Sequence, residues 1–131
     1  MKGGDREFDD LLDTTCGSSL NGLLDGAYKE VSSGLVPEYV YDEYANNWVV
    51  LCSYARKIQN RSGSAQGIVR KAMLQNVDSW NHTLKFARTF RDNRLAPNDP
   101  RVTQFFAAQK QLFDLQRQAV FDYMINIGVA N

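Results

Sequence analysis

Apolar residues recur at helical spacing over two long stretches, and this periodicity constrains the fold more than any other feature of the chain. Successive apolar positions lie three or four residues apart throughout, which places them along one side of an α-helix. They are Tyr41, Tyr44, Trp48, Leu51, Ala55 and Ile58 in the first stretch, and Val69, Met73, Val77, Trp80, Leu84 and Ala87 in the second. No segment shows a convincing strand pattern, so the sequence predicts an all-α fold.

Proline and glycine stand where helices would begin and end. Pro37 and Pro100 suit the first turn of a helix, and Asp99 is a typical N-cap residue. Gly34 and Gly128 suit helix termination. Together with the apolar periodicity, this punctuation predicts helices over residues 5–13, 20–31, 37–57, 65–91 and 100–127.

Three long amphipathic helices with short connections are expected to pack against one another. We therefore predict an antiparallel helical bundle of three long helices plus one or two shorter N-terminal helices. At 131 residues the chain fits one domain, and its 44% apolar content is too high for a disordered protein. Residues 1–17 are expected to form an acidic N-terminal arm on that domain.

The last predicted helix has an unusually wide apolar arc. Its expected seam is accompanied by a second row of large apolar residues. The seam consists of Phe105, Ala108, Leu112, Leu115 and Ala119, and the second row includes Phe106, Phe113 and Val120. A bundle of this size does not need so many apolar faces, so the second row suggests burial against another subunit.

The formal net charge is zero, but the charges are sorted along the chain. Residues 1–50 hold ten acidic and three basic side chains, whereas residues 51–110 hold eleven basic and three acidic ones. A chain polarised in this way can bind a polyanion with its middle, associate with copies of itself, or fold so that the two segments neutralise each other.

Five basic residues flank the predicted turn at residues 60–64, between the two long apolar stretches. They are Arg56, Lys57, Arg61, Arg70 and Lys71, and no acidic residue occurs between positions 51 and 77. Lysine and arginine bind nucleic-acid phosphates without reading sequence. Tyr54 lies among them and is predicted to stack on a base. We call these five cations the hairpin cluster.

A second group of cations surrounds the next predicted turn. It consists of Lys85, Arg88, Arg91, Arg94 and Arg101. An antiparallel hairpin is expected to bring Glu38, Asp42 and Glu43 close to this secondary basic patch. Exposed pairs of that kind contribute only about 0–1 kcal/mol each.

The sequence contains no convincing catalytic or metal-binding set. His82 lies near Asp78 and Ser79, but these groups do not converge as a serine triad requires. The HExxH motif, the P-loop and the GxGxxG motif are all absent from the sequence. A small helical enzyme that uses Glu38, Asp42 or His82 is therefore disfavoured, and no metal or cofactor is expected.

The two cysteines, Cys16 and Cys52, are 36 residues apart and lack a CxxC arrangement. They fit free thiols in a reducing compartment better than a disulfide framework. The first residues are acidic, unlike a signal peptide, and no apolar run is long enough for a membrane span. A cytoplasmic or virion location without membrane contact is expected.

These observations favour a non-enzymatic structural protein that self-assembles into a ring or filament, as coat and nucleocapsid proteins do. The acidic N-terminal region of one copy would meet the basic middle of the next. The hairpin cluster would contact the phosphates of RNA or another single-stranded nucleic acid. The alternative is a helical protein–protein adaptor or assembly factor that binds no nucleic acid.

Overall fold

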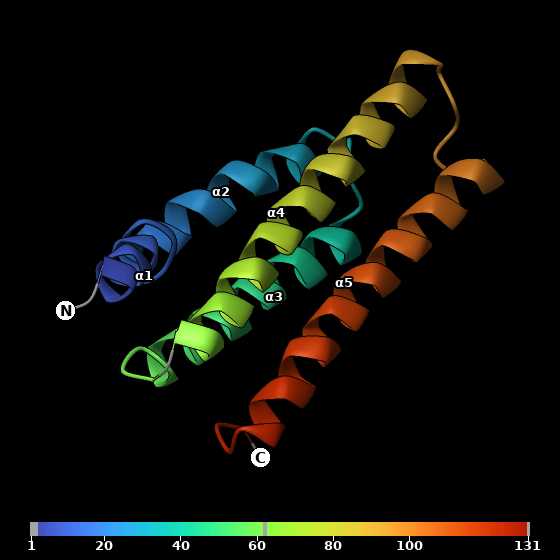
Figure 1. The fold of residues 1–131 in the computed structure, drawn as a ribbon. Coiled ribbons are helices and arrows are strands. Elements are labelled where there is room, and N and C mark those ends of the chain that lie inside the picture. The colour runs from blue at the N-terminus through green and yellow to red at the C-terminus, as the bar shows by residue number, and fades with distance from the viewer. Residues whose placement is uncertain (1–2, 62, 131) are drawn as a thin grey trace.

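The computed structural model describes residues 3–61 and 63–130, and these residues form five packed α-helices without a strand. The helices are α1 (Gly3–Thr15), α2 (Ser18–Ser32), α3 (Glu38–Lys57), α4 (Gly63–Asp92) and α5 (Pro100–Asn126). The prediction of an all-α fold is confirmed. Figure 1 shows α3, α4 and α5 side by side, with α4 running opposite to its neighbours along the chain.

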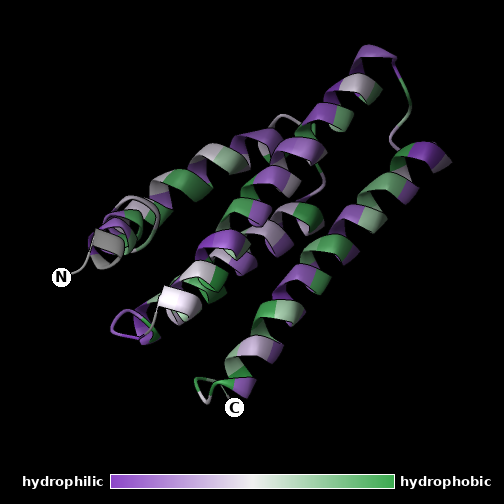
Figure 2. Ribbon diagram, viewed as in Figure 1, coloured by the Kyte–Doolittle hydropathy of each residue, from purple (hydrophilic) through white to green (hydrophobic). Residues whose placement is uncertain are grey.

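The two predicted apolar stripes of α3 and α4 form the centre of the core. Trp48 and Val69 are almost completely buried, and the rings of Tyr44 and Trp80 stack with their centroids 4.5 Å apart. Figure 2 shows hydrophobic and hydrophilic residues mixed along every helix, as expected when each helix buries one side. The spacing rule therefore identified the inward faces of both helices correctly.

The inward face of α5 differs from the prediction. Phe106, Phe113 and Val120 are 5%, 0% and 6% exposed, so they face the core of this chain and not another subunit. In contrast, Leu112 and Leu115 of the expected seam are 37% and 59% exposed. Both stripes have helical spacing, and the stripe with the larger aromatic residues buries more apolar area by facing inward.

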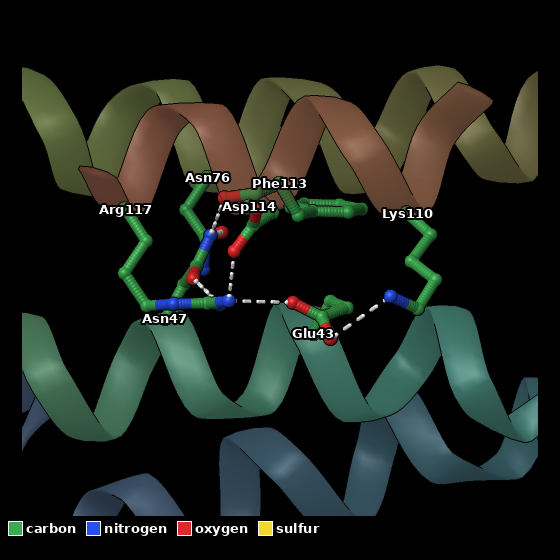
Figure 3. Close-up of polar contacts among 7 residues, drawn as sticks. All are labelled: Glu43, Asn47, Asn76, Lys110, Phe113, Asp114 and Arg117. Carbon is green, nitrogen blue, oxygen red and sulfur yellow. Dashed lines mark hydrogen bonds and ion pairs between the residues drawn. The ribbon is translucent and has the colours of Figure 1, made fainter. Parts of the chain in front are cut away.

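A buried polar network fixes α5 against α3 and α4 (Figure 3). The Asn47 side-chain amide of α3 donates to the Asn76 side-chain oxygen of α4, at 3.1 Å, and to the Phe113 carbonyl of α5, at 3.0 Å. Asn76 in turn donates to the Tyr44 carbonyl. Asn47 and Asn76 are only 3% and 1% exposed. Because unpaired buried amides are costly, these bonds favour one register of the three helices.

Arg117 of α5 completes the network at the edge of the core. Its guanidinium donates to Asn47 Oδ1 at 2.6 Å, to Glu43 Oε1 at 2.8 Å and to Asp114 Oδ1 at 2.6 Å. Lys110 Nζ lies 3.8 Å from the other oxygen of Glu43. The hollow beside Asn47 and Arg117 has a volume of only about 10 Å³, which is room for a single water molecule. The network is therefore a structural element.

The N-terminal helix α1 packs into the core instead of forming a separate arm. Phe8 and Leu12 of α1 are 0% and 2% exposed, and α1 contacts α2, α3 and α4. Part of the predicted acidic arm over residues 1–17 thus lies against the other helices, and the side chains of residues 1–5 lie outside the described part. Burial of these two apolar side chains favours packing of the helix against the rest of the chain.

The prediction of free thiols is also wrong, because Cys16 and Cys52 form a disulfide bond. The bond joins the α1–α2 turn to the C-terminal part of α3. The turn itself requires Gly17, whose φ of 66° favours glycine and which packs against Arg56. The pairing depends on α1 and α2 folding back onto α3. The spacing of the two cysteines in the sequence does not predict this arrangement.

The disulfide leads to a first prediction. Cys52→Ser is expected to lower the free energy of unfolding by about 3–4 kcal/mol, because the bond restricts a long loop in the unfolded chain. Urea denaturation of the oxidised wild type and the variant measures the difference. Reduced wild-type protein should match the variant, and a wild-type transition that is insensitive to reductant would contradict the assignment.

The network leads to a second prediction. Arg117→Met is expected to lower the free energy of unfolding by about 2–3 kcal/mol, because it leaves Glu43 and Asp114 without their main donor. The double variant Glu43→Leu/Arg117→Met should recover part of this loss, since it also removes the half-buried carboxylate. Urea denaturation of the three proteins provides the test. A double variant less stable than Arg117→Met would show that Glu43 stabilises the fold by other contacts.

Candidate interaction surfaces

The fold brings the hairpin cluster to one end of the molecule but spreads it over several helices. The Arg56 guanidinium lies beside Gly17 at the α1–α2 turn, whereas Arg61 Nη1 donates to the Ile127 carbonyl after α5, at 3.0 Å. Arg70 is half-buried, and Lys71 is exposed two turns into α4. The five cations therefore belong to α3, the α3–α4 connection and α4, and Arg56 and Arg61 each lie against another segment of the chain.

Two findings weaken the cluster as a phosphate-binding site. Tyr54 is only 8% exposed, so its ring cannot stack on a base, and burial raises the pKa of its hydroxyl. The acidic helix α1 lies at the same end of the molecule, because Asp9 accepts a 2.8 Å hydrogen bond from Gln59 in the α3–α4 connection. Asp9, Asp10 and Asp13 are exposed there and repel phosphate.

The secondary basic patch has acidic partners, but they are not the expected ones. Three of its members form ion pairs over 2.8–3.6 Å. The pairs are Arg88 with Glu30, Arg91 with Asp92, and Arg101 with Asp99. Arg101 also donates its backbone N–H to Asp99, and these bonds lower the pKa of the Asp99 carboxyl to about 2. Glu43, in contrast, pairs with Lys110 and Arg117 of α5.

The groups considered for catalysis do not form a reactive set. His82 is exposed and packs against the rings of Phe86 and Phe105, with centroid distances of 4.8 and 6.0 Å. The Ser79 hydroxyl accepts a hydrogen bond from Gln116. Glu38 and Asp42 are exposed on the first turns of α3, where the helix dipole favours negative charge. Within the described residues, no three His, Cys, Asp or Glu side chains could hold a metal ion.

A long surface without charge runs along the outer side of α5. Between Arg101 and Asp122, the charged residues of α5 belong to the polar network. Lys110 and Arg117 pair with Glu43 of α3, and Asp114 pairs with Arg117. The outward residues are alanine, glutamine and leucine, and two residues of α4 border them. We define this α4–α5 face as Gln104, Ala107, Ala108, Gln111, Leu112, Leu115, Gln118 and Ala119 of α5 with His82 and Phe86 of α4.

The composition of the α4–α5 face is unusual for a surface in contact with water. Designed and natural surfaces are about one quarter to one third charged, whereas the centres of protein interfaces are depleted of charge. Leu115 is 59% exposed, and Leu112 and Phe86 are each 37% exposed. The small side chains of Ala108 and Ala119 beside them allow another helix to approach closely. The face therefore has the chemistry of a protein interface.

The sequence contains a signal for this face that the periodicity analysis missed. The three charged residues between Arg101 and Asp122 are Lys110, Asp114 and Arg117, and they fall within 60° of one another on a helical wheel. The opposite side of the helix must then be free of charge. Reading charge together with hydrophobicity would have placed Leu112 and Leu115 outward.

Comparisons with protein-family models, curated proteins and solved structures find no match to this chain. None of the helices in residues 3–61 and 63–130 combines the length and apolar character needed to cross a membrane.

Binding of nucleic acid by the hairpin cluster remains a prediction. Arg61→Glu/Lys71→Glu is expected to weaken binding of a single-stranded RNA oligonucleotide at least tenfold at low salt, because each reversal removes one phosphate contact and adds repulsion. Fluorescence anisotropy measures the affinity. Lys29→Glu/Lys85→Glu changes the net charge equally at other sites and should have a smaller effect. A wild-type protein that shows no binding of the RNA at low salt would contradict the prediction of nucleic-acid binding.

Proposed function

We propose that this protein is a non-enzymatic helical bundle that assembles with copies of itself through the α4–α5 face. One observation carries the proposal: over five turns, the outward side of α5 presents no charge and includes Leu112 and Leu115. Water solvates such a surface poorly, and its burial against a similar surface is favourable.

A second copy is the partner that suits this face best. An uncharged face meets itself without like-charge repulsion, which a two-fold contact between identical surfaces requires. Glutamine amides both donate and accept, so Gln104, Gln111 and Gln118 can pair with the same residues of another copy. The outward side of α5 is about 30 Å long over its five turns, which is long enough for a continuous helix–helix contact with a second copy.

The proposed contact differs from the head-to-tail contact that the sequence suggested. The acidic helix α1 packs beside the hairpin cluster of its own chain, so its charge is partly compensated before any second copy arrives. A contact between identical faces forms a closed pair, whereas a ring or filament needs two different faces. RNA binding at the exposed cations Lys57, Arg61 and Lys71 is a separable part of the proposal.

A matched pair of substitutions tests the assembly. Leu115→Asp places a charge in the α4–α5 face and is expected to raise the dimer Kd at least tenfold, because buried interface leucines tolerate no unpaired charge. Leu74→Asp is the control, since Leu74 is equally exposed, at 60%, but lies outside the face. Sedimentation equilibrium over a range of concentrations measures both.

The wild type should reach the mass of a pair at high concentration, and Leu74→Asp should follow it. A wild-type protein that stays monomeric throughout, or equal dissociation in both variants, would contradict the proposal. In the second case, the effect of Leu115→Asp would not be specific to the α4–α5 face.

A further inference from the structure

A hollow of about 730 Å³ lies where the α2–α3 and α4–α5 connections meet, at the end of the molecule opposite the hairpin cluster. The buried side chains of Val36, Val102 and Phe106 form part of its wall, together with the half-buried Phe90. Sites for small molecules usually have volumes of about 300–1,000 Å³ and mostly apolar walls. The hollow therefore has the size and lining of a small-molecule site.

Three charged side chains also line this hollow. Arg91 and Arg94 contribute positive charge, and Glu38 contributes one negative charge. Arg91 is already paired with Asp92, with 3.3 Å between Nε and Oδ1. Among residues 6–61 and 63–130, no carboxylate pairs with Arg94. The hollow thus offers one uncommitted guanidinium beside apolar walls, which suits a ligand with a single negative charge.

The backbone at Arg94 has a conformation that is strained for a residue other than glycine. Three helix ends share the same pair of closing hydrogen bonds, and the residue that follows the last turn has positive φ in each. After α2 and α5 that residue is Gly34 or Gly128, whereas after α4 it is Arg94 with φ 57°. Glycine adopts this conformation without strain and arginine does not.

The backbone strain at Arg94 is explained if the side chain of this residue has a function at the hollow. A strained non-glycine residue persists only when the surrounding structure enforces it, and such residues gather at functional sites. The Arg94 N–H donates to the Arg91 carbonyl and the Leu95 N–H to the Phe90 carbonyl, so the fold needs the bend. It does not need the arginine side chain to form it.

We propose that this hollow binds a small apolar carboxylate. The apolar body of the ligand packs against Phe90, Val102 and Phe106, and its carboxylate pairs with the guanidinium of Arg94. Arginine suits this role because its two parallel N–H groups match the two oxygens of a carboxylate. Glu38 at the same hollow repels ligands of higher negative charge. The proposal does not depend on self-association.

Isothermal titration calorimetry with decanoate, below its micellar concentration, tests the proposal. The wild type is expected to bind decanoate in a saturable manner and to bind decyltrimethylammonium, a cation with the same chain length, at least tenfold more weakly. Arg94→Gly should weaken decanoate binding at least tenfold, which corresponds to the loss of one charge-assisted hydrogen bond. The same substitution should raise the melting temperature by a few degrees, because it relieves the strain.

Three further variants complete the experiment. Arg94→Gln keeps a side chain at this position and should lose decanoate affinity without the gain in melting temperature. Lys85→Gln removes a charge from α4 outside the hollow and should bind as the wild type does. Glu38→Gln should bind decanoate more tightly, because it removes a nearby negative charge. No saturable binding to the wild type, or unchanged affinity in Arg94→Gly, would overturn the proposal.

Discussion

The orientation of α5 depends on one buried polar contact set, in which Arg117 and Asn47 join three helices. The Asn47 amide has bonding partners on α4 and α5 at the same time, so a shift of either helix would leave buried donors unpaired. Arg117 adds bonds to Asn47 and Glu43 on α3. Apolar packing alone is compatible with several rotations of an amphipathic helix about its axis. The hydrogen bonds of this network are all satisfied in one of these orientations.

The same network determines what α5 presents to solvent. Lys110 and Arg117 pair with Glu43, and Asp114 pairs with Arg117, so these three charges lie on one side of α5. The opposite side of α5 therefore carries no charge over five turns. Leu112 and Leu115 face outward, while Phe113 and Val120 fill the core. The position of the charges on α5 thus determines both the orientation of this helix in the fold and the uncharged face that we propose for assembly.

Much of the fold was predictable from local patterns, because helix periodicity and capping residues act within a few turns. The apolar stripes of α3 and α4 and the start of α5 at Pro100 agree with the structure. The disulfide between Cys16 and Cys52 was not predictable, since it depends on how α1 and α2 fold back onto α3. The strong charge polarity along the sequence is partly neutralised by contacts such as Glu30 with Arg88, which depend on tertiary packing. Of the predicted site residues, Tyr54 is buried, and the five cations are divided among α3, the α3–α4 connection and α4.

The central claim is that the network leaves α5 with an outward face that pairs with a second copy. Methyl NMR spectra recorded over a range of protein concentrations test it directly. The account predicts that the methyl signals of Leu112 and Leu115 shift with concentration, while those of the buried Leu51 and the exposed Leu74 do not. Concentration-independent signals from Leu112 and Leu115 would contradict it, as would shifts confined to Leu74.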